Sequence, residues 1–326
     1  MSECPSRNLG LDLVRATEAA ALTAGRWMGL GRAEEADQAA AQAMAQALHA
    51  VGIEGDISFG EGTLRDYATL LSNISAGSGL LVDVVLDPID GRALVAHGCP
   101  GAISVMAGAP SGALCSLLPA VYMDKIVVNA QVAEALVPEC MDAPAAWTLA
   151  LAARAKGKQV GNLTVFVLDR PRHADLIEEI RAAGAHVMLR TEGDITGALL
   201  AASLQSGVDL LMGVGGVLEG LISACAVKAM GGAMLGRLAP QSEKERAGVR
   251  GAGLDVKQIW TGDGLASSDA VFFAATGITD GPLLSGVRYH GNYATSNSMI
   301  LRGETGTRRI MQTEHVIYRP LGFPKL

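Results

Sequence analysis

The sequence is poor in the residues on which several common functions depend. Only 18% of its 326 residues are charged and only 4% are aromatic; the net charge is −7, and the basic residues are scattered. A protein whose main partner is nucleic acid usually carries clustered basic residues. We therefore expect no nucleic-acid partner.

Cysteine and histidine are also few and dispersed. The five cysteines show neither paired nor metal-type spacing, and their odd number is typical of free thiols in a reducing compartment. The six histidines are equally scattered, which argues against a zinc site. We expect a cytoplasmic protein in which any metal is held by oxygen ligands.

Long hydrophobic runs are missing as well. No apolar run reaches membrane-spanning length, and the N-terminal segment lacks the charged-then-apolar layout of a signal peptide. We expect no membrane partner. What the sequence does contain is 49% hydrophobic residues and 40 glycines, a composition typical of a compact globular protein.

The order of predicted elements favours an α/β protein with two lobes. Helices are predicted over 11–28 and 34–50. The strands predicted next, all in the first lobe, are 57–59, 80–86, 102–107 and 125–129. After an alanine-rich helix, strands and helices alternate at short spacing from 163 to 230, which predicts a parallel sheet. We place the lobes at 1–158 and 159–326, with the last seventy or so residues completing the second.

The most informative segment is Asp87-Pro88-Ile89-Asp90-Gly91-Arg92. It places two carboxylates three residues apart at the end of an apolar run, and its proline and glycine predict a sharp turn. Carboxylates held in this way suit Mg²⁺ or Mn²⁺, which favour oxygen ligands. The alternative is an Asp-Pro turn that only closes a strand.

Three further acids lie where a ligand could reach them. Asp37 is in the first turn of the second predicted helix, where it could equally complement the helix dipole. Glu61 lies between two glycines after a short strand, and glycines allow close backbone approach to a ligand. Glu219 follows the glycine cluster 213–216 and opens a helix.

The predicted strands of the second lobe end in polar segments. These segments are Asp169-Arg170-Pro171-Arg172-His173, Glu192-Gly193-Asp194 and the glycine cluster. Ligands collect at such strand ends, and arginines beside helix N-termini can hold phosphate. The arginines could otherwise be solvated loop charges. The glycine cluster lacks the third glycine of a dinucleotide fingerprint, which disfavours nicotinamide binding, and Tyr122-Met123-Asp124-Lys125 is typical of a strand edge.

Taken in order, these motifs form a pattern. They are Trp27-x-Gly29-x-Gly31, Ala36-Asp37, Gly60-Glu61-Gly62, the 87–91 segment, Tyr122-Met123, Arg170-Pro171-Arg172-His173, Gly193-Asp194, Gly213-x-Gly215-Gly216-x-x-Glu219-Gly220, 274–281 and Leu301-Arg302-Gly303. In order and spacing they resemble the class II fructose-1,6-bisphosphatases, within the lithium-sensitive phosphatase superfamily. The resemblance runs from about residue 10 to residue 315.

The resemblance implies a layered α/β/α/β/α sandwich and hydrolysis of the 1-phosphate of a sugar bisphosphate with Mg²⁺ or Mn²⁺. It also implies a homo-oligomer, a dimer or tetramer, with metal bound in the first lobe and sugar phosphate in the second. The implied metal ligands are Asp37, Glu61, Asp87, Asp90 and Glu219. The implied substrate-binding residues are Asp90, Gly91, Arg92, Tyr122, Arg170, Pro171, Arg172, Glu192, Gly193, Asp194 and Gly216.

Several positions depart from the family pattern. Arg92 stands where the family has the threonine that helps orient the attacking water, and Thr63-Leu64-Arg65-Asp66 replaces the acids that follow Gly-Glu-Gly. A lysine expected before Asp37 aligns with Ala33, and Asp90 replaces the family's glutamate but matches the wider superfamily. An arginine cannot act as a base, because its pKa stays above about 12.

These departures leave two functional hypotheses. In the first, the chain is an active phosphatase in which Asp90, Arg92, Thr63 and Asp66 form the catalytic set: Asp66 is a shifted acid, Thr63 supplies the hydroxyl, and Arg92 binds a second anionic group. In the second, the chain is a non-catalytic paralogue that binds sugar phosphate and regulates a partner. A purely structural role would leave the clustered acids and arginines unexplained.

Overall fold

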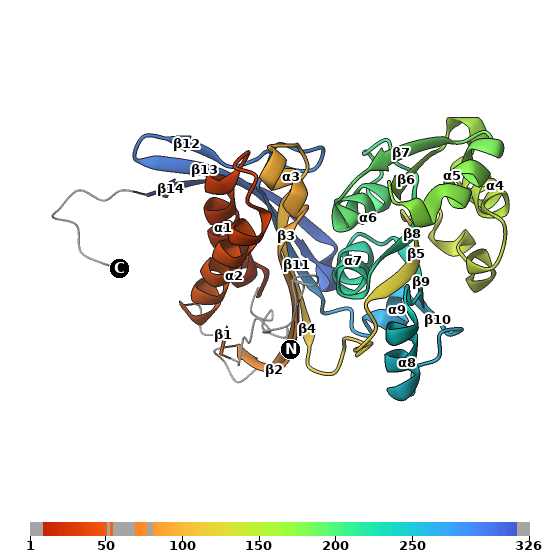
Figure 1. The fold of residues 1–326 in the computed structure, drawn as a ribbon, viewed down its shortest axis with the longest axis horizontal. Helices are drawn as coiled ribbons and strands as arrows, with labels where there is room; N and C mark the ends of the chain where they lie inside the picture. Colours follow the sequence, from red (N-terminus) through yellow and green to blue (C-terminus); the bar gives the residue numbers. More distant parts are fainter. Residues whose placement is uncertain (1–8, 51–52, 55–68, 77–80, 318–326) are drawn as a thin grey trace, which may run out of the picture.

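The computed structural model describes residues 9–50, 53–54, 69–76 and 81–317, and it confirms the predicted two-domain α/β fold. Figure 1 shows five layers: helices α1 and α2, the first sheet, helices α6 and α7, the second sheet, and helices α4 and α5. The predicted layered sandwich is therefore present. None of the helices in the described part of the chain is both long and apolar enough to cross a membrane.

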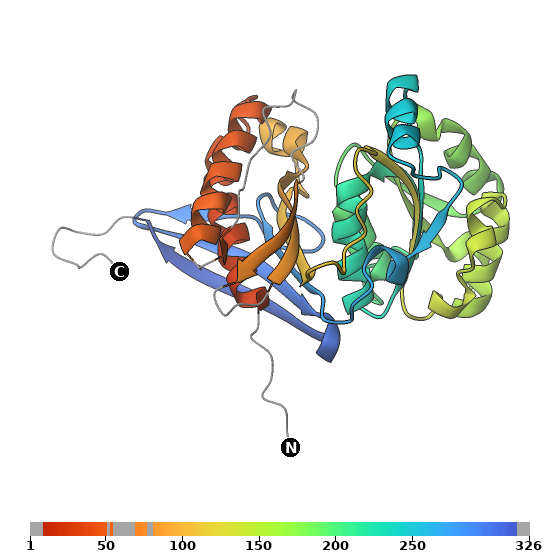
Figure 2. The same cartoon turned by 90° about the horizontal axis from the view of Figure 1, so that it is seen from below.

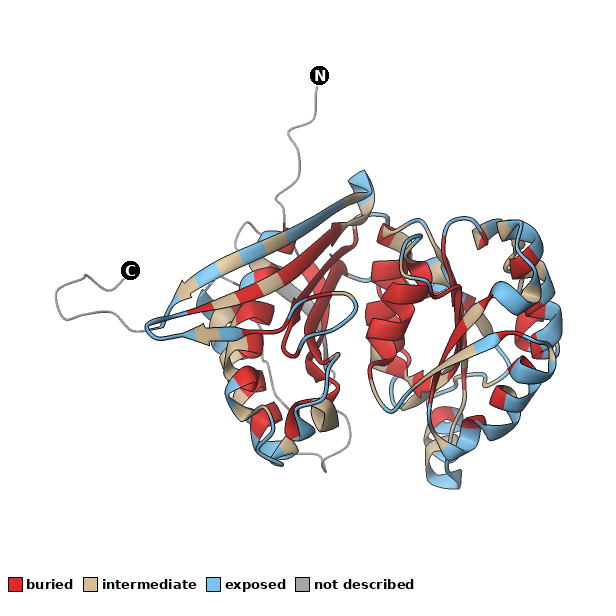
Figure 3. Ribbon diagram, turned by 90° about the horizontal axis from the view of Figure 1, so that it is seen from above, coloured by how far each residue is buried: buried red, intermediate tan, exposed pale blue. Residues whose placement is uncertain are grey.

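The helices that form the layers differ in burial. Their bounds are α1 Leu9–Ala24, α2 Ala33–Ala50, α4 Ala145–Lys156, α5 Ala174–Ala182, α6 Asp194–Ala202 and α7 Val217–Ala229. All nine residues of α6 are buried, because the helix lies between two sheets. The outer helices each bury one face, as the mixed colours of Figure 3 show. The remaining α-helices of the described residues are α3 Arg92–His97, α8 Glu243–Gly251 and α9 Gly262–Leu265.

The first sheet is antiparallel in all of its described pairings. Its strands are β1 Ile53–Glu54, β2 Thr69–Ala76, β3 Leu81–Asp90, β4 Ile103–Pro110, β11 Phe272–Gly277, β12 Arg288–His290, β13 Tyr293–Arg302 and β14 Thr307–Val316. The order is β1-β2-β3-β4-β11-β13-β12, with β14 also paired to β13. Figure 2 shows the blue C-terminal strands running along this domain. The predicted strand 57–59 lies outside the described residues.

The second sheet is mixed: the three strands predicted between residues 163 and 212 pair in parallel as expected, and three further strands join them in antiparallel pairings. Its strands are β5 Tyr122–Val128, β6 Thr164–Leu168, β7 His186–Arg190, β8 Leu210–Gly216, β9 Ala233–Leu238 and β10 Ile259–Thr261, in the order β10-β9-β5-β8-β6-β7. Only β6 pairs in parallel, with β7 and with β8. Strands β8 and β9 run in the same direction, but β5 lies between them and is antiparallel to both. Strand β5 is thus an interior strand, not the predicted edge.

The strand pairings divide the chain differently from the predicted lobes 1–158 and 159–326. Strand β5 belongs to the second sheet although it precedes residue 158, and β11, β13 and β14 return to the first sheet. The reason is burial. All six residues of β11 are buried, and the strand completes the first sheet by pairing with β4 on one side and β13 on the other.

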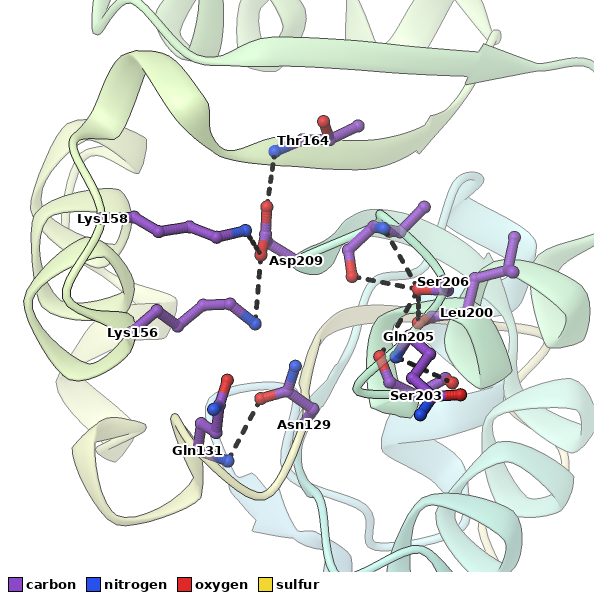
Figure 4. Close-up of polar contacts among 11 residues, drawn as sticks. Asn129, Gln131, Lys156, Lys158, Thr164, Leu200, Ser203, Gln205, Ser206 and Asp209 are labelled. Atoms are coloured by element: carbon purple, nitrogen blue, oxygen red, sulfur yellow. Dashed lines mark hydrogen bonds and ion pairs between the residues drawn. The ribbon is translucent and has the colours of Figure 1, made fainter.

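A buried ion cluster fixes one end of the second sheet. Asp209 accepts hydrogen bonds from Lys158 Nζ at 2.8 Å and from the Thr164 backbone N–H at 2.9 Å, and Lys156 Nζ lies 3.0 Å away (Figure 4). Burial alone would raise the pKa of Asp209, but these hydrogen bonds outweigh it and the pKa is lowered. The cluster therefore joins the C-terminal end of α4 to the starts of β6 and β8.

Candidate functional site

A cavity of about 390 Å³ lies where β3, β6 and β8 end and where α3, α6 and α7 begin. It is lined by Asp87, Ile89, Asp90, Gly91, Arg92, Tyr122, Leu168, Arg170, Arg172, Glu192, Gly193, Asp194, Gly215, Gly216 and Glu219. The structure thus brings together most of the predicted site residues. Asp37 and Pro171 are not in the lining, and Glu61, Thr63 and Asp66 lie outside the described residues.

The wall nearest the first domain is formed by an irregular end of β3. The strand continues to Asp90 instead of ending at Leu86, and its register against β4 shifts between Asp87 and Asp90. The chain therefore bulges at Pro88 and turns only at Gly91, whose φ is 99°. A side chain at Gly91 would be strained at that φ, and its Cβ would lie 2.9 Å from Leu94 Cδ1.

Three acids of the lining, Asp87, Asp90 and Glu219, and the neighbouring Asp37 are coupled through Asp87. Burial raises the pKa of Asp37, Asp87 and Glu219 to about 7 and raises that of Asp90 well above its usual range. Like charges add to burial: Asp37 raises the pKa of Asp87, and Asp87 raises that of Asp90 and of Glu219. Positive charge placed among these acids would favour their ionised forms and lower the raised pKa values.

The buried carboxylate of Asp37 gives the clearest evidence that this region suits a positively charged ligand. The residue is fully buried in α2, and neither of its carboxylate oxygens has a hydrogen-bond partner among the described residues. Leaving a buried polar group unpaired costs on the order of 1–3 kcal/mol, and more when the group is charged. A native protein retains such a group when it has a use for it.

The donor set fits a hard divalent cation in chemistry, since every acid here offers carboxylate oxygen. Within the described residues, no group of three or more Asp, Glu, His or Cys side chains is arranged to hold a metal ion. The fifth predicted ligand, Glu61, belongs to the part of the chain that is not described. The four described acids are therefore candidates for part of a site.

Arg92 brings a positive charge to the same wall. Its side chain lines the cavity at the start of α3, and its charge lowers the pKa of Asp37 and of Asp87 against the larger effect of burial. The guanidinium therefore interacts electrostatically with Asp37 in α2 and with Asp87 in β3. This is the position at which the sequence departs from the family threonine.

The opposite wall carries the predicted arginines. Arg172 Nη2 donates to the Val214 carbonyl at 2.9 Å, and its guanidinium carbon lies 5.2 Å from the centre of the Tyr122 ring. Burial, with the nearby charge of Arg170, lowers the pKa of Arg172 against the effects of Tyr122 and Asp194. Because these contacts hold Arg172 in one orientation, its remaining donors can face an anion.

Glu192 connects the two walls. Its Oε2 accepts from the Ala93 backbone N–H at 2.9 Å, and its Oε1 lies 3.9 Å from Arg170 Nη2. One carboxylate thus contacts α3 from the first domain and the loop after β6 from the second. This contact between the domains could not be inferred from the spacing of the two segments in the sequence.

Pro171 and His173 belong to the segment that carries the two arginines, although neither lines the cavity itself. Pro171 begins a short 3₁₀ turn, Pro171–His173, that follows Arg170. His173 Nε2 accepts from the Val214 backbone N–H at 2.8 Å, so its Nδ1 carries the proton and donates to the Leu168 carbonyl at 2.6 Å. Burial lowers the pKa of His173, in agreement with a neutral ring. The histidine joins the ends of β6 and β8 and so supports both arginines.

Lys125 is the functional candidate that the sequence did not reveal. Its side chain, 1% exposed, forms an ion pair with Asp194, and its Nζ lies 3.4 Å from the Gly216 carbonyl oxygen. The glycines beside it leave room for these acids, because a Cβ at Gly215 would displace the Asp194 carboxylate and one at Gly216 would displace the Glu219 carboxylate. The available signal was a lysine followed by an unbroken apolar run, Ile126-Val127-Val128. Lys125 is not part of the cavity lining, whereas Ile89, Leu168 and Gly215 line the cavity without having been predicted.

Comparison with known proteins gives a consistent result. A family model described as bacterial fructose-1,6-bisphosphatase, glpX-encoded, matches residues 7–315. A D-fructose 1,6-bisphosphatase class 2/sedoheptulose 1,7-bisphosphatase of Synechococcus sp. (strain JA-3-3Ab) is 37% identical, over 94% of this chain and 95% of its own length. A fructose-1,6-bisphosphatase class 2 of Haemophilus influenzae is 35% identical, over 96% of this chain and 97% of its own.

Proposed function

The chain belongs to the class 2 fructose-1,6-bisphosphatase family, and we propose that it removes the 1-phosphate of fructose 1,6-bisphosphate or of a related sugar bisphosphate. The observation that carries the proposal is a single cavity with carboxylates on one wall and arginines on the other. One wall suits a cation and the transferred phosphate, and the other suits a second anionic group of the same substrate.

The acidic wall would hold the cofactor. We assign Mg²⁺ or Mn²⁺ to Asp37, Asp87, Asp90 and Glu219, with Glu61 as a further ligand. When bound, such a cation polarises the phosphoryl group and makes a water molecule more acidic. The raised pKa values and the Asp37 oxygens, which have no hydrogen-bond partner among the described residues, support this assignment, since a bound cation would favour the ionised carboxylates and would give those oxygens a partner.

The second wall would orient the sugar phosphate. Arg170 and Arg172 can donate to a phosphate group, and Tyr122 holds the second of them in place. Glu192 and Asp194 can accept hydrogen bonds from sugar hydroxyls. Gly91, Pro171, Gly193 and Gly216 contribute through their backbone, which shapes the loops at the cavity.

The catalytic step would rely on Asp90 and Arg92, with Thr63 and Asp66. Arg92 cannot take a proton from water, so we assign it to binding a phosphate oxygen close to Asp87. Thr63 and Asp66 would replace the family threonine and acids that orient the water. We further propose that the protein works in the cytoplasm as a homo-oligomer, a dimer or tetramer.

One observation favours a second candidate function. The charge of Arg92 acts on Asp37 and Asp87, two of the acids assigned to the cation. A fixed guanidinium there would take over part of the role of a metal ion and leave a protein that binds sugar phosphate without turnover. Such a paralogue would act as a regulator of a partner.

Phosphate release separates the two candidates. The purified protein is incubated with fructose 1,6-bisphosphate and a panel of sugar bisphosphates and monophosphates, with Mg²⁺, with Mn²⁺ or with chelator. An active phosphatase releases phosphate only with a cation. A regulator releases none on any substrate, yet shows substrate-dependent thermal stabilisation.

A further inference from the structure

The outer strand of the first sheet has one edge without a described partner strand along its whole length. Strand β14 pairs with β13 on one side, and no other described strand pairs with it. It contains ten residues in continuous register, with neither proline nor a bulge. Figure 1 shows that the C-terminal end of β14 lies at the end of the first domain that is remote from the second sheet.

Soluble proteins normally protect such an edge. A long, regular edge strand offers a row of unpaired N–H and C=O groups to other chains, and native proteins interrupt it with proline, bulges or short strands. Strand β14 has neither proline nor a bulge and is ten residues long, so exposed charged residues, Arg308, Arg309 and Glu314, are the one protective feature that it carries. A second strand added along the edge would satisfy the same backbone groups.

Exposed hydrophobic side chains gather in the same place. Of the ten large hydrophobic residues exposed among the described residues, four belong to β13, β14 or the residue that follows. They are Tyr293 at 44%, Ile310 at 52%, Val316 at 66% and Ile317 at 39% exposure. Figure 3 shows β14 in pale blue and tan beside the red portion of β13. Apolar surface collected on one strand pair indicates an interaction surface.

The two faces of β14 differ. On one face Met311 packs against the core around α1 and α2, and His315 Nε2 lies 2.8 Å from Ser296 Oγ. On the other face Arg308, Ile310 and Glu314 are all exposed. Neither Arg308 nor Glu314 forms an ion pair with another described residue. Among the described residues, one face of β14 is therefore exposed, and one of its edges has no paired strand.

The charges of this face complement a second copy of the same strand. In a symmetric antiparallel pair the two-fold axis passes through opposed identical residues, and an axis through Met311 or Gln312 gives the greatest overlap of β14 with its copy. With the axis at Met311, Arg308 lies opposite Glu314 of the other copy, twice. With the axis at Gln312, Glu314 would instead lie opposite Ile310. Charge complementarity therefore selects the first register.

We propose that β14 is a self-association surface, at which two copies of this chain pair antiparallel about Met311 and join their first sheets into one continuous sheet. In this arrangement the two Ile310 side chains lie diagonally across the axis on the exposed face. The inference rests on the described edge strand and does not depend on the proposed phosphatase activity.

Sedimentation velocity of the full chain and its variants tests the proposal. Wild type is expected at twice the 33.6 kDa chain mass, or at a multiple of that dimer. Arg308→Glu and Glu314→Arg each place like charges opposite each other at two positions, so each should weaken dimerisation on the order of ten-fold or more. The double variant R308E/E314R should restore it. Arg309→Glu is the matched control, since Arg309 faces Thr313 of the other copy in this register.

The outcomes are distinct. Dissociation by either single reversal, with rescue in the double variant and little effect of R309E, supports the assignment. A monomeric wild type overturns it. An oligomer that is unchanged by both reversals and by Ile310→Lys also overturns it, because the copies would then meet elsewhere. Far-ultraviolet circular dichroism checks that each variant is folded.

Discussion

Lys125 and Asp194 form a buried ion pair that joins an interior strand of the second sheet to the first residue of α6, and Asp194 lines the cavity. The lysine also reduces the otherwise raised pKa of Glu219. One buried cation therefore acts on an acid assigned to sugar binding and on one assigned to the metal. We regard Lys125 as a positioning residue for both.

Replacing Lys125 should affect stability and substrate binding separately. Lys125→Met leaves Asp194 buried without its partner, which should cost on the order of 3–5 kcal/mol in the free energy of unfolding. The double variant K125M/D194N should recover most of that stability, but not the KM for sugar bisphosphate. Denaturant unfolding and steady-state kinetics measure the two effects. Equal KM values in wild type and K125M would show that the pair is only structural.

Arg92 should control how strongly the acidic wall needs a cation. Arg92→Thr removes the charge beside Asp37 and Asp87, so we expect tighter Mn²⁺ binding by calorimetry, on the order of ten-fold. Arg92→Lys, which keeps a positive charge, is the control and should remain close to wild type in metal affinity. If the threonine variant binds Mn²⁺ no more tightly than the lysine variant, Arg92 does not oppose the cation.

Asp37 should reduce the stability of the metal-free protein. Its buried oxygens have no described hydrogen-bond partner, so Asp37→Asn should raise the free energy of unfolding in chelator on the order of 1–3 kcal/mol while removing stabilisation by Mn²⁺. Asp209→Asn is the matched control with the opposite sign, because Asp209 accepts hydrogen bonds from Lys158 and Thr164. Destabilisation by both substitutions would contradict the strained role of Asp37.

The raised pKa values predict an inverse pH dependence for the metal-free protein. Asp37 and Asp87 titrate at 3.8 when unperturbed and Glu219 at 4.5, but all three rise to about 7 in the fold. The folded state then binds more protons than the unfolded state between these values, so stability should be highest below about 4 at these three sites and fall as pH rises through 7. Thermal melts in chelator from pH 5 to pH 8 measure this trend.

The matching control repeats the melts with Mn²⁺. A bound cation favours the ionised carboxylates, so the fall in melting temperature between pH 5 and pH 8 should become smaller or reverse. A protein whose chelator-treated melting temperature rises steadily over this range would contradict burial of the three acids in their protonated form.

The family resemblance supplied the layered sandwich. The sequence motifs predicted most of the cavity, because motifs at strand ends are local and strand ends meet at one edge of a sheet. Sequence reasoning failed where distant pairing decided the outcome. Strand β5 is a short apolar segment that fits either sheet by pattern, and only its pairing with β8 and β9 places it in the second. Likewise, only its pairing with β4 shows that β11 belongs to the first sheet.

Within the site, the features that the sequence did not reveal also depend on contacts between distant segments. The acids and arginines belong to recognisable motifs, whereas Lys125 was hidden in a strand whose neighbours could not be known. Glu192 was predicted as a binding residue, but its contact with the Ala93 N–H joins two segments 99 positions apart. Pro88 was expected to turn the chain, yet pairing with β4 carries the strand on to Asp90.

The most direct test of the central claim is phosphate release from fructose 1,6-bisphosphate by the purified full chain, followed with Mn²⁺ or Mg²⁺ and with chelator. The account predicts turnover that requires the cation and that is abolished in Asp87→Asn. Binding of the sugar bisphosphate without any phosphate release, under every cation condition, would contradict it and would favour the regulatory paralogue.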